Sequence, residues 1–559
     1  MKNGFWKKIM SVALAFAMMV SVTACSSGDG ETAAADKDGK AAAENAEEIT
    51  IRMGRQTLQN PKLPEGDTYE NNAYTRMLED KLNVKIVDEF EANGDDYDRQ
   101  VSLALSAGDI PDIMKVTSLD ELQELYENDL IADLTESYES YASDYLKGIY
   151  DSYGKRALDN VTFDGKIMAI PGTNADSGPS IVWIRSDWTD ALGIHIDEDG
   201  DGCITIEELE MTAKEFMDKN PGNAENVVGI ALAPWLTSGD PDGTYSMNSL
   251  AYAMGAYPKT WYEKDGKIIY GSTTEEMKNA LITAAGWYQD GILDPQAGTR
   301  TWDDITALLA NGQTGITFGT WHIPDWLLNN VYALNKEAAF QAYALKDADG
   351  KVNCKHNDAT NGYMVVSKKF AHPELAVEIA NLFYDELPNA SSLAEDYPEV
   401  AKYMEDGVDG STRPFNIEIN SYTSLLDDYE DLKQCLDGKI TAEEVRSAEQ
   451  RTNAAVIGAY LEGSDDATGW AKYHSRMKGV NLIYELTENN LFSWLTPLFP
   501  QTTPTMETNW ANLEKLEEET FIKIVTGVED AETGFAQFTE AWNAQGGAQI
   551  IEEIAAQER

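Results

Sequence analysis

Residues 97–116, YDRQVSLALSAGDIPDIMKV, hold a helix, a turn and a strand in close succession. The pattern predicts a helix over 97–106 that stops at Gly108, because glycine suits the left-handed position that follows a helix. Pro111 cannot continue a helix, so residues 111–116 are predicted to form a strand. The stretch therefore predicts one helix-to-strand connection of a mixed fold.

The same alternation extends on both sides of this stretch. Strands are predicted over 49–53 and 84–87, where apolar residues follow a strand pattern. Helices are predicted over 72–82, which has an apolar face, and near 120–127. Strands that alternate with helices favour an α/β fold with a parallel sheet.

The composition bounds the size of the protein and its partners. At 559 residues the chain is long for one hydrophobic core, so two or more compact units are expected. Its 43 Lys and Arg against 96 Asp and Glu give a formal charge of -53, which argues against nucleic acid and anionic lipid as partners. The cysteines at 25, 203, 354 and 435 and the scattered histidines show no spacing of a disulfide framework or a zinc site.

The first 24 residues have the pattern of a secretory signal peptide. Three lysines precede an apolar run over 10–20, which is too short to span a bilayer. The run ends in Val-Thr-Ala-Cys25, which resembles the lipobox of bacterial lipoproteins. That resemblance implies a lipid (palmitate) on Cys25 and a place on the outer face of the cell membrane, as in Gram-positive bacteria. Residues 25–46 are small and polar, so a flexible tether is expected, and no later apolar run is long enough for a transmembrane helix.

Residues 197–208, DEDGDGCITIEE, match the calcium-binding loop of an EF-hand, followed by a predicted helix over 206–217. Hard oxygen donors in this number favour Ca²⁺ over transition metals. A solvated acidic turn is the alternative. Because there is a single loop rather than a pair, a static structural brace is expected, not a sensor. The predicted ligands are Asp197, Asp199, Asp201, the backbone carbonyl of Cys203, Thr205 and Glu208.

The segment LSAGDIPDIM at 105–114 resembles one found in the extracellular solute-binding proteins of carbohydrate-type ABC importers (family 1). Other similar segments follow in the family's order: FDGKIMAIP at 163–171, WIRSDW at 183–188, GITFGTW at 315–321 and GYMVVS at 362–367. Members that bind alginate oligosaccharides carry a similar calcium loop, which favours a saccharide as the ligand.

The resemblance implies a fold and its partners. The fold would be a two-lobed, type II periplasmic-binding-protein clamshell with strand crossings between α/β lobes and the ligand between them. Lobe one is expected over 47–171 plus 345–400, and lobe two over 180–340 plus 400–559. Residues 385–480 are expected to be helical insertions on lobe two. The protein would be a monomer that delivers its ligand to ABC permease subunits and touches the membrane only through its lipid anchor.

Ligand-binding candidates are aromatic residues and polar residues near strand ends. Trp321 stands where the family has a stacking tryptophan, and Trp235 is the second aromatic candidate; for both, the alternative is a place in the core. Arg185 is a weaker candidate, since such arginines are more often structural ion-pair partners. The polar and remaining candidates are Gln56, Thr117, Asn174, Asp176, Arg185, Asn248 and Tyr252.

These features predict a lipid-anchored receptor of an ABC importer that binds an oligosaccharide and carries out no catalysis. An oligopeptide-binding lipoprotein is the first alternative, because it would share the tether and the two lobes. A secreted glycoside hydrolase is the second alternative, since it would also use aromatic residues with a pair of carboxylates. No nucleophile elbow, zinc-protease or P-loop motif supports an enzyme.

Overall fold

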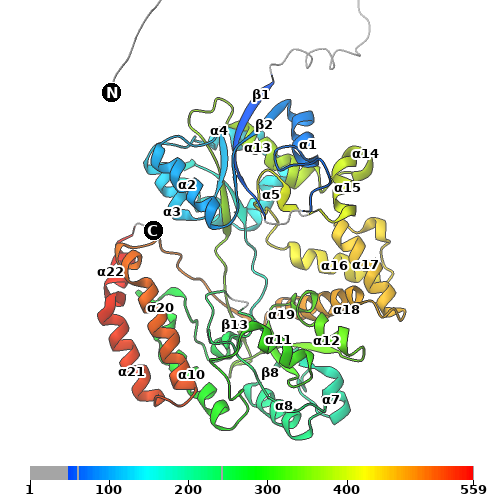
Figure 1. Ribbon diagram of the computed structural model, residues 1–559, viewed down its shortest axis with the longest axis vertical. Helices are drawn as coiled ribbons and strands as arrows, with labels where there is room; N and C mark the ends of the chain where they lie inside the picture. The colour runs from blue at the N-terminus through cyan, green and yellow to red at the C-terminus, as the bar shows by residue number, and fades with distance from the viewer. Residues whose placement is uncertain (1–47, 59–61, 241–242, 409, 558–559) are drawn as a thin grey trace, which may run out of the picture. The chain divides into compact units, whose positions relative to one another are not determined.

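A computed structural model describes the chain except residues 1–47, 59–61, 241–242, 409 and 558–559. The chain divides into two units, Met1–Glu48 and Ile49–Arg559. The expected signal peptide, Cys25 and the tether up to residue 46 fall outside the described residues. The second unit contains all the described helices and strands (Figure 1), and none of these helices is both long enough and apolar enough to span a membrane.

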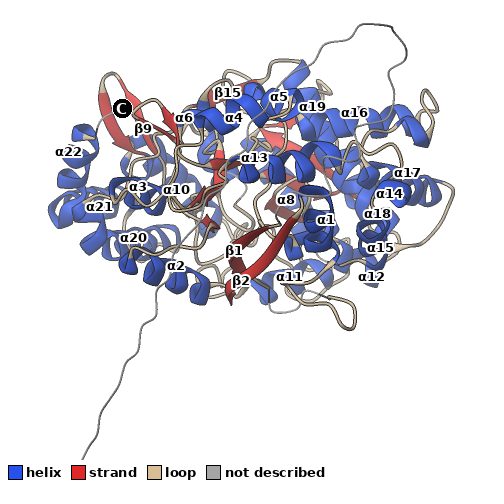
Figure 2. Cartoon of the chain, turned by 90° about the horizontal axis from the view of Figure 1, so that it is seen from above, coloured by secondary structure: helices blue, strands red, loops and turns tan. Residues whose placement is uncertain are grey.

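The first sheet has five strands in the order β2-β1-β3-β14-β6. Its first three strands are parallel, as predicted, whereas β14 runs antiparallel to both of its neighbours. Figure 2 shows β1 and β2 side by side. The strands are β1 (Ile49–Gln56), β2 (Val84–Ala92), β3 (Ile113–Val116), β6 (Ile170–Thr173) and β14 (Thr360–Val366), with a short hairpin of β4 (Thr162–Phe163) and β5 (Lys166–Ile167).

Helices cover both faces of this sheet, and its apolar residues lie in two buried clusters. They are α1 (Ala73–Leu82), α2 (Asp95–Ala107), α3 (Leu119–Glu127), α4 (Thr135–Tyr141), α5 (Asp144–Ser152), α6 (Arg156–Asp159), α13 (Glu374–Asn381), α14 (Leu393–Asp396) and α15 (Pro398–Asp406). The predicted helices over 72–82, 97–106 and 120–127 are therefore confirmed to within two residues at each end.

The stretch 97–116 folds as its sequence predicts. Helix α2 ends at Ala107, and Gly108 takes the left-handed conformation with φ of 62° while its N–H bonds back to the last turn. After the turn, the Asp112 carboxylate accepts a bond of 2.9 Å from the backbone N–H of Arg52. This bond joins the start of β3 to β1, so the turn residues also fix how the two strands meet.

The second sheet has four strands in the order β11-β7-β12-β8. Strand β7 is antiparallel to β11 and β12, and its side chains alternate between two cores: Val182 and Ile184 face one, Ile181 and Trp183 the other. The strands are β7 (Ile181–Arg185), β8 (Cys203–Ile204), β11 (Ile316–Gly319) and β12 (Phe340–Leu345). Two strand pairs stand beside it: β9 (Trp261–Lys264) with β10 (Lys267–Tyr270), and β13 (Val352–Lys355) with β15 (Phe492–Leu495).

Helices pack around the second sheet as well, and two further helices, over 424–436 and 448–461, form a small core of their own beside them. They are α7 (Ser186–Leu192), α8 (Ile206–Lys219), α9 (Asn248–Ala253), α10 (Glu275–Gln289), α11 (Trp302–Ala310), α12 (Asn329–Leu334), α16 (Ser424–Leu436), α17 (Ala448–Leu461), α18 (Ala467–His474), α19 (Asn481–Glu488), α20 (Pro504–Val525), α21 (Ala531–Trp542) and α22 (Ala548–Ala556). The last three pack on one of the two cores of this sheet together with α10.

The chain passes between the two sheets three times. Residues 174–180 lead from β6 to β7, residues 356–359 lead from β13 to β14, and residues 420–423 lead from Ile419 in the first core to α16. We call these segments crossings one, two and three. The fold is thus the expected two-lobed α/β fold, with lobe one around the first sheet and lobe two around the second.

Two lobe boundaries differ from the expected ones. Strand β13 was expected in lobe one, but it pairs with β15 of lobe two. The expected insertion over 385–480 is shared between the lobes, because Tyr397, Val400 and Tyr403 belong to the lobe-one core and the Tyr403 ring lies edge-on to Tyr74 at 5.8 Å. Only its later helices, from α16 onward, join lobe two.

Candidate functional site

Five aromatic rings form a continuous row in lobe two, which we call the aromatic row: Trp321, His322, Trp326, Trp302 and Trp235. The centroids of successive rings are 5.0, 6.2, 5.7 and 6.4 Å apart. The last three indoles are nearly parallel, with interplanar angles of 19° and 16°. The row therefore presents a series of flat faces rather than isolated rings.

The local fold explains where the row stands. Strand β11 ends at Gly319, which pairs with Ile181, the first residue of β7 after crossing one. The chain then turns, and Trp321 follows directly. Trp302 is the first residue of α11, whose N-cap Thr301 accepts from the N–H of Asp304. The row thus lies at the end of the second sheet where the chain arrives from lobe one.

Three of the indoles are open to solvent and the fourth is held in place. Trp235, Trp302 and Trp326 are 36%, 37% and 41% exposed, which is unusual for residues of this size. Trp321 is half-buried under the guanidinium of Arg476, which lies 5.1 Å from the ring centroid. Exposed, nearly parallel indoles suit the apolar faces of sugar rings, whereas the anchored Trp321 fixes one end of the row.

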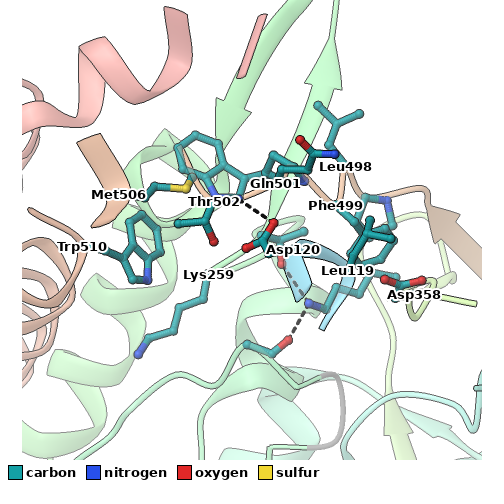
Figure 3. Close-up of a pocket in the computed structure, with 16 residues that line it drawn as sticks. Leu119, Asp120, Lys259, Asp358, Leu498, Phe499, Gln501, Thr502, Met506 and Trp510 are labelled. Atoms are coloured by element: carbon teal, nitrogen blue, oxygen red, sulfur yellow. Dashed lines mark hydrogen bonds between the residues drawn. The ribbon is translucent and has the colours of Figure 1, made fainter. Parts of the chain in front are cut away.

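A pocket of about 580 Å³ is lined by residues of both lobes (Figure 3). In the figure, Trp510, Met506 and Lys259 lie on one side, and Leu119 and Phe499 on the other. The lobes also touch here, since the backbone N–H of Thr502 donates to Asp120 over 3.4 Å. Gly239 in the pocket wall belongs to the loop that carries Trp235, so this loop connects the pocket with the aromatic row.

Lys355 is a buried cation in the wall of this pocket. Its side chain donates to the carbonyl of Gly239 over 2.5 Å and to the Thr260 hydroxyl over 3.1 Å, and both acceptors are uncharged. Burial lowers the pKa of Lys355 to about 8. The ammonium can offer hydrogen bonds to hydroxyl or carboxylate oxygens that enter the pocket.

The buried side chain of Glu517 connects elements that lie next to the pocket wall. Glu517 is fully buried and accepts bonds from Tyr270 at 2.9 Å, Ser272 at 3.0 Å and Thr237 at 3.5 Å. Burial raises the pKa of Glu517 to about 7, although the nearby charge of Lys259 acts in the opposite direction. Glu517 thus ties α20 to the loops that hold the pocket wall.

The sequence pattern of the bacterial extracellular solute-binding proteins matches residues 73–400, which is more than half of the chain. The chain belongs to this family. A search of curated proteins gives no match to this solute-binding protein.

Solved structures of other proteins share the fold. The alginate-binding protein AlgQ2, without calcium ion, is 14% identical with a TM-score of 0.55. An HMO-binding, ABC-transporter-associated protein of Bifidobacterium longum infantis is 14% identical with a TM-score of 0.57. An EF-hand mutant of the Streptococcus pneumoniae substrate-binding protein FusA, in complex with fructo-nystose, is 16% identical with a TM-score of 0.53. Each match covers 90% of this chain and 97% of the other.

Trp321 and Trp235, the two aromatic candidates in this solute-binding protein, are the two ends of the aromatic row. Sequence reasoning missed His322, Trp326 and Trp302, which lie between them. A partial signal for Trp302 was present, because Thr301 with Asp304 three residues later has the pattern of a capping box, which places Trp302 at the first position of a helix. Trp326 has no comparable signal, because its place depends on the turn after Pro324.

Two polar candidates of the solute-binding protein lie near strand ends in lobe one, as predicted. Thr117 follows β3 and is exposed. Its backbone N–H and its hydroxyl both donate to the Glu121 carboxylate. Thr117 stands two residues before Leu119, which lines the pocket. Gln56 ends β1 and accepts a bond of 3.1 Å from the Lys115 ammonium. Neither side chain lines the pocket described above.

Three other candidates have structural roles instead. Arg185 is buried, forms a two-bond ion pair with Asp187 at 2.7 and 2.5 Å, and stands at the end of β7 opposite to the aromatic row. Asn248 is fully buried. Its side-chain amide accepts from the N–H of Ser238 and donates to the carbonyl of Ser238, so it shapes the loop after Trp235. Tyr252 is 2% exposed and packs in the core. The expectation that these three contact ligand is not supported by their positions, because each side chain is enclosed by protein.

The last two candidates lie in crossing one. The Asn174 backbone N–H donates to the carbonyl of Ala359 over 3.0 Å. The Asp176 side chain is 4% exposed and both of its oxygens accept bonds from protein groups. The Asp176 side chain therefore links segments of the solute-binding protein, and neither residue is among those that line the pocket.

The predicted calcium loop has the backbone of a tight turn. Asp197 accepts from the N–H groups of Asp201 at 3.0 Å and Gly202 at 3.1 Å, and Gly202 has a φ of 78°. Burial raises the pKa of Asp197. Thr205 caps α8, and Glu208 at the third helical position bonds back to it at 2.8 Å. This capping box begins the predicted helix at Ile206 as expected.

The carboxylates of this loop already attract a cation of the protein. The Lys346 ammonium lies 3.0 Å from Asp199 and 3.5 Å from Asp201, the residues at the third and fifth loop positions. The oxygen-rich donor set suits calcium. In the part of the chain that the structure describes, however, no three Asp, Glu, His or Cys side chains gather into a ready-made metal site. Calcium binding therefore stays a prediction.

Proposed function

We propose that this solute-binding protein is the lipid-anchored receptor of an ABC importer and that it captures an oligosaccharide. The aromatic row carries the proposal. Three solvent-exposed indoles, two pairs of them stacked within 6.4 Å, form a surface that a chain of sugar rings can lie on. The pocket lined by both lobes would enclose one end of such a chain, with Lys355 and Lys259 as donors to its oxygens.

A peptide receptor and a glycoside hydrolase would each need features that the aromatic row and the pocket do not offer. A peptide receptor would need protein groups that form regularly spaced hydrogen bonds with the backbone of the bound peptide, and an indole face does not supply them. A glycoside hydrolase would need two carboxylates on opposite sides of a sugar bond. Asp120 and Asp358 both line the pocket, but Asp358 accepts bonds from Asn160 and from Thr360, which fix it as part of lobe one. A binder rather than an enzyme is therefore proposed.

The test is isothermal titration calorimetry of the purified protein against panels of oligosaccharides and oligopeptides, with analysis of the sugars after incubation. The proposal expects tight binding of at least one oligosaccharide without release of shorter sugars. Binding of peptides alone would replace the saccharide assignment with the peptide one. Shortening of any glycan would identify an enzyme.

Membrane attachment through Cys25 is part of the proposal. A tethered receptor stays close to its permease, so the tether raises the effective concentration of one for the other. Changing Cys25→Ala in cells should release the protein into the medium while ligand binding stays unchanged. Retention of the variant in the membrane fraction would argue against a lipid anchor.

Calcium would be held by Asp197, Asp199, Asp201, Thr205, Glu208 and the carbonyl of Cys203. When bound, the ion would supply a cross-link between the turn and the first turn of α8. A site of the extracellular type binds at roughly 0.1 to 1 mM, so 10 mM calcium should raise the melting temperature by about 2–4 °C. Differential scanning fluorimetry with calcium, with magnesium and with a chelator measures this.

Glu208→Gln removes the only two-oxygen ligand predicted for this ion, so calcium should no longer shift the melting temperature of that variant. The matched control is Glu207→Gln, since the neighbouring Glu207 holds no ligand position in the loop. An unchanged melting temperature of the unmodified protein between chelator and 10 mM calcium would remove the proposed brace.

A further inference from the structure

All three crossings meet at one carboxylate. Asp176 in crossing one accepts bonds of 2.6 Å from the backbone N–H of Asn357 and 2.6 Å from Nδ1 of His356, both in crossing two. It accepts a third bond of 2.5 Å from the hydroxyl of Tyr422 in crossing three. With its side chain only 4% exposed, Asp176 has exchanged water for these three donors.

The two rings on this carboxylate are anchored in different lobes. The His356 imidazole stacks on Trp494 of lobe two, at 4.7 Å and 7° between the planes. The Tyr422 ring lies edge-on to Tyr153 of lobe one at 5.4 Å. Asp176 therefore stands between one ring that belongs to lobe two and one ring that belongs to lobe one.

Further bonds hold the same segments together. Thr173, the last residue of β6 before crossing one, exchanges two bonds of 2.8 and 3.0 Å with Asn420 in crossing three. The amide of Asn357 donates to the carbonyl of Ala175 over 3.0 Å, which joins the second crossing to the first. Crossing one is thus bonded to crossings two and three, and the Asp176 side chain bonds to both of them at once.

We propose that Asp176 is the pivot of the hinge between the lobes: a shared acceptor that makes the three crossings turn together. Any rotation of one lobe against the other must occur in the backbone of these crossings. Loss of any one of these donors would cost free energy, because it would leave the buried Asp176 carboxylate with a missing hydrogen bond. A change in one crossing is therefore passed to the others. The proposal concerns the protein without ligand and holds whatever ligand it binds.

Tyr422→Phe tests this coupling, since it removes one hydroxyl from crossing three and keeps the ring on Tyr153. Hydrogen–deuterium exchange of the full chain should become about tenfold faster in crossing two, at the amide of Asn357, although no atom there has changed. The matched control is Asp294→Asn, which alters a buried carboxylate whose partners, Arg300 and the N–H of Gln296, lie within lobe two. The control should leave exchange in all three crossings unchanged.

The motion of the lobes gives a second measurement. Spin labels at Leu103→Cys in lobe one and Val528→Cys in lobe two, which are 58% and 73% exposed, report the distance between the lobes without ligand. Tyr422→Phe and Asp176→Asn should both broaden this distance distribution, and Asp294→Asn should not. Faster exchange confined to crossing three, or an unbroadened distribution in both hinge variants, would overturn the proposal.

Discussion

Trp302→Ala is expected to weaken binding of the preferred oligosaccharide about 100-fold, which corresponds to about 2–3 kcal/mol. Trp302 is the middle one of the three exposed indoles in the aromatic row, stacked between Trp235 at 6.4 Å and Trp326 at 5.7 Å. Its loss removes one indole face and also leaves the two neighbours without the ring that keeps them parallel. Calorimetric titration with the oligosaccharide that binds the unmodified protein most tightly measures the effect.

The control for this prediction is Tyr141→Ala. Tyr141 is also an exposed aromatic residue, 48% exposed at the end of α4, but it belongs to lobe one and to neither the row nor the pocket. Its removal should leave the affinity unchanged, and circular dichroism should show that both variants remain folded. An affinity of the Trp302 variant within twofold of the unmodified protein, for every sugar bound, would separate the aromatic row from ligand binding.

Relative to the unmodified protein, the Glu517→Gln variant is expected to be more stable at pH 8 than at pH 5. Burial raises the pKa of Glu517 from 4.5 to about 7, so the folded state favours the protonated carboxyl. The contribution of this group to stability is fully present below about pH 4.5 and is lost as the pH rises through 7. Glutamine resembles the protonated acid at every pH. Between pH 5 and pH 8 the variant should therefore gain roughly 2–3 kcal/mol in unfolding free energy over the unmodified protein.

Urea denaturation at the two pH values, followed by fluorescence, measures this difference. Glu518→Gln is the matched control, because the neighbouring Glu518 is 47% exposed and pairs with Lys259 at the surface. That variant should differ from the unmodified protein by less than about 1 kcal/mol at both pH values. A Glu517→Gln variant with the same stability difference at pH 5 and pH 8 would show that the buried carboxyl does not titrate as proposed.

The sequence by itself predicted those elements whose signals are local. The end of α2 at Gly108, the strand after Pro111 and the start of α8 at Ile206 each depend on one or two residues and their immediate backbone. These local patterns, taken in order, also led to the α/β class and to the family. Trp321 was a candidate because it follows a recognisable strand segment, GITFG at 315–319.

Only the tertiary structure decided which side chains come together. Trp302 and Trp326 join the aromatic row because α11 and the turn after β11 meet at the same end of the second sheet, over a separation that no local pattern encodes. Asp176 looked like a ligand residue since it is polar and lies at the crossing between the lobes, yet its partners come from distant segments that only folding brings near. Polar residues carry no local sign of their partners, whereas turns and caps do, and this is why the fold was more predictable than the site.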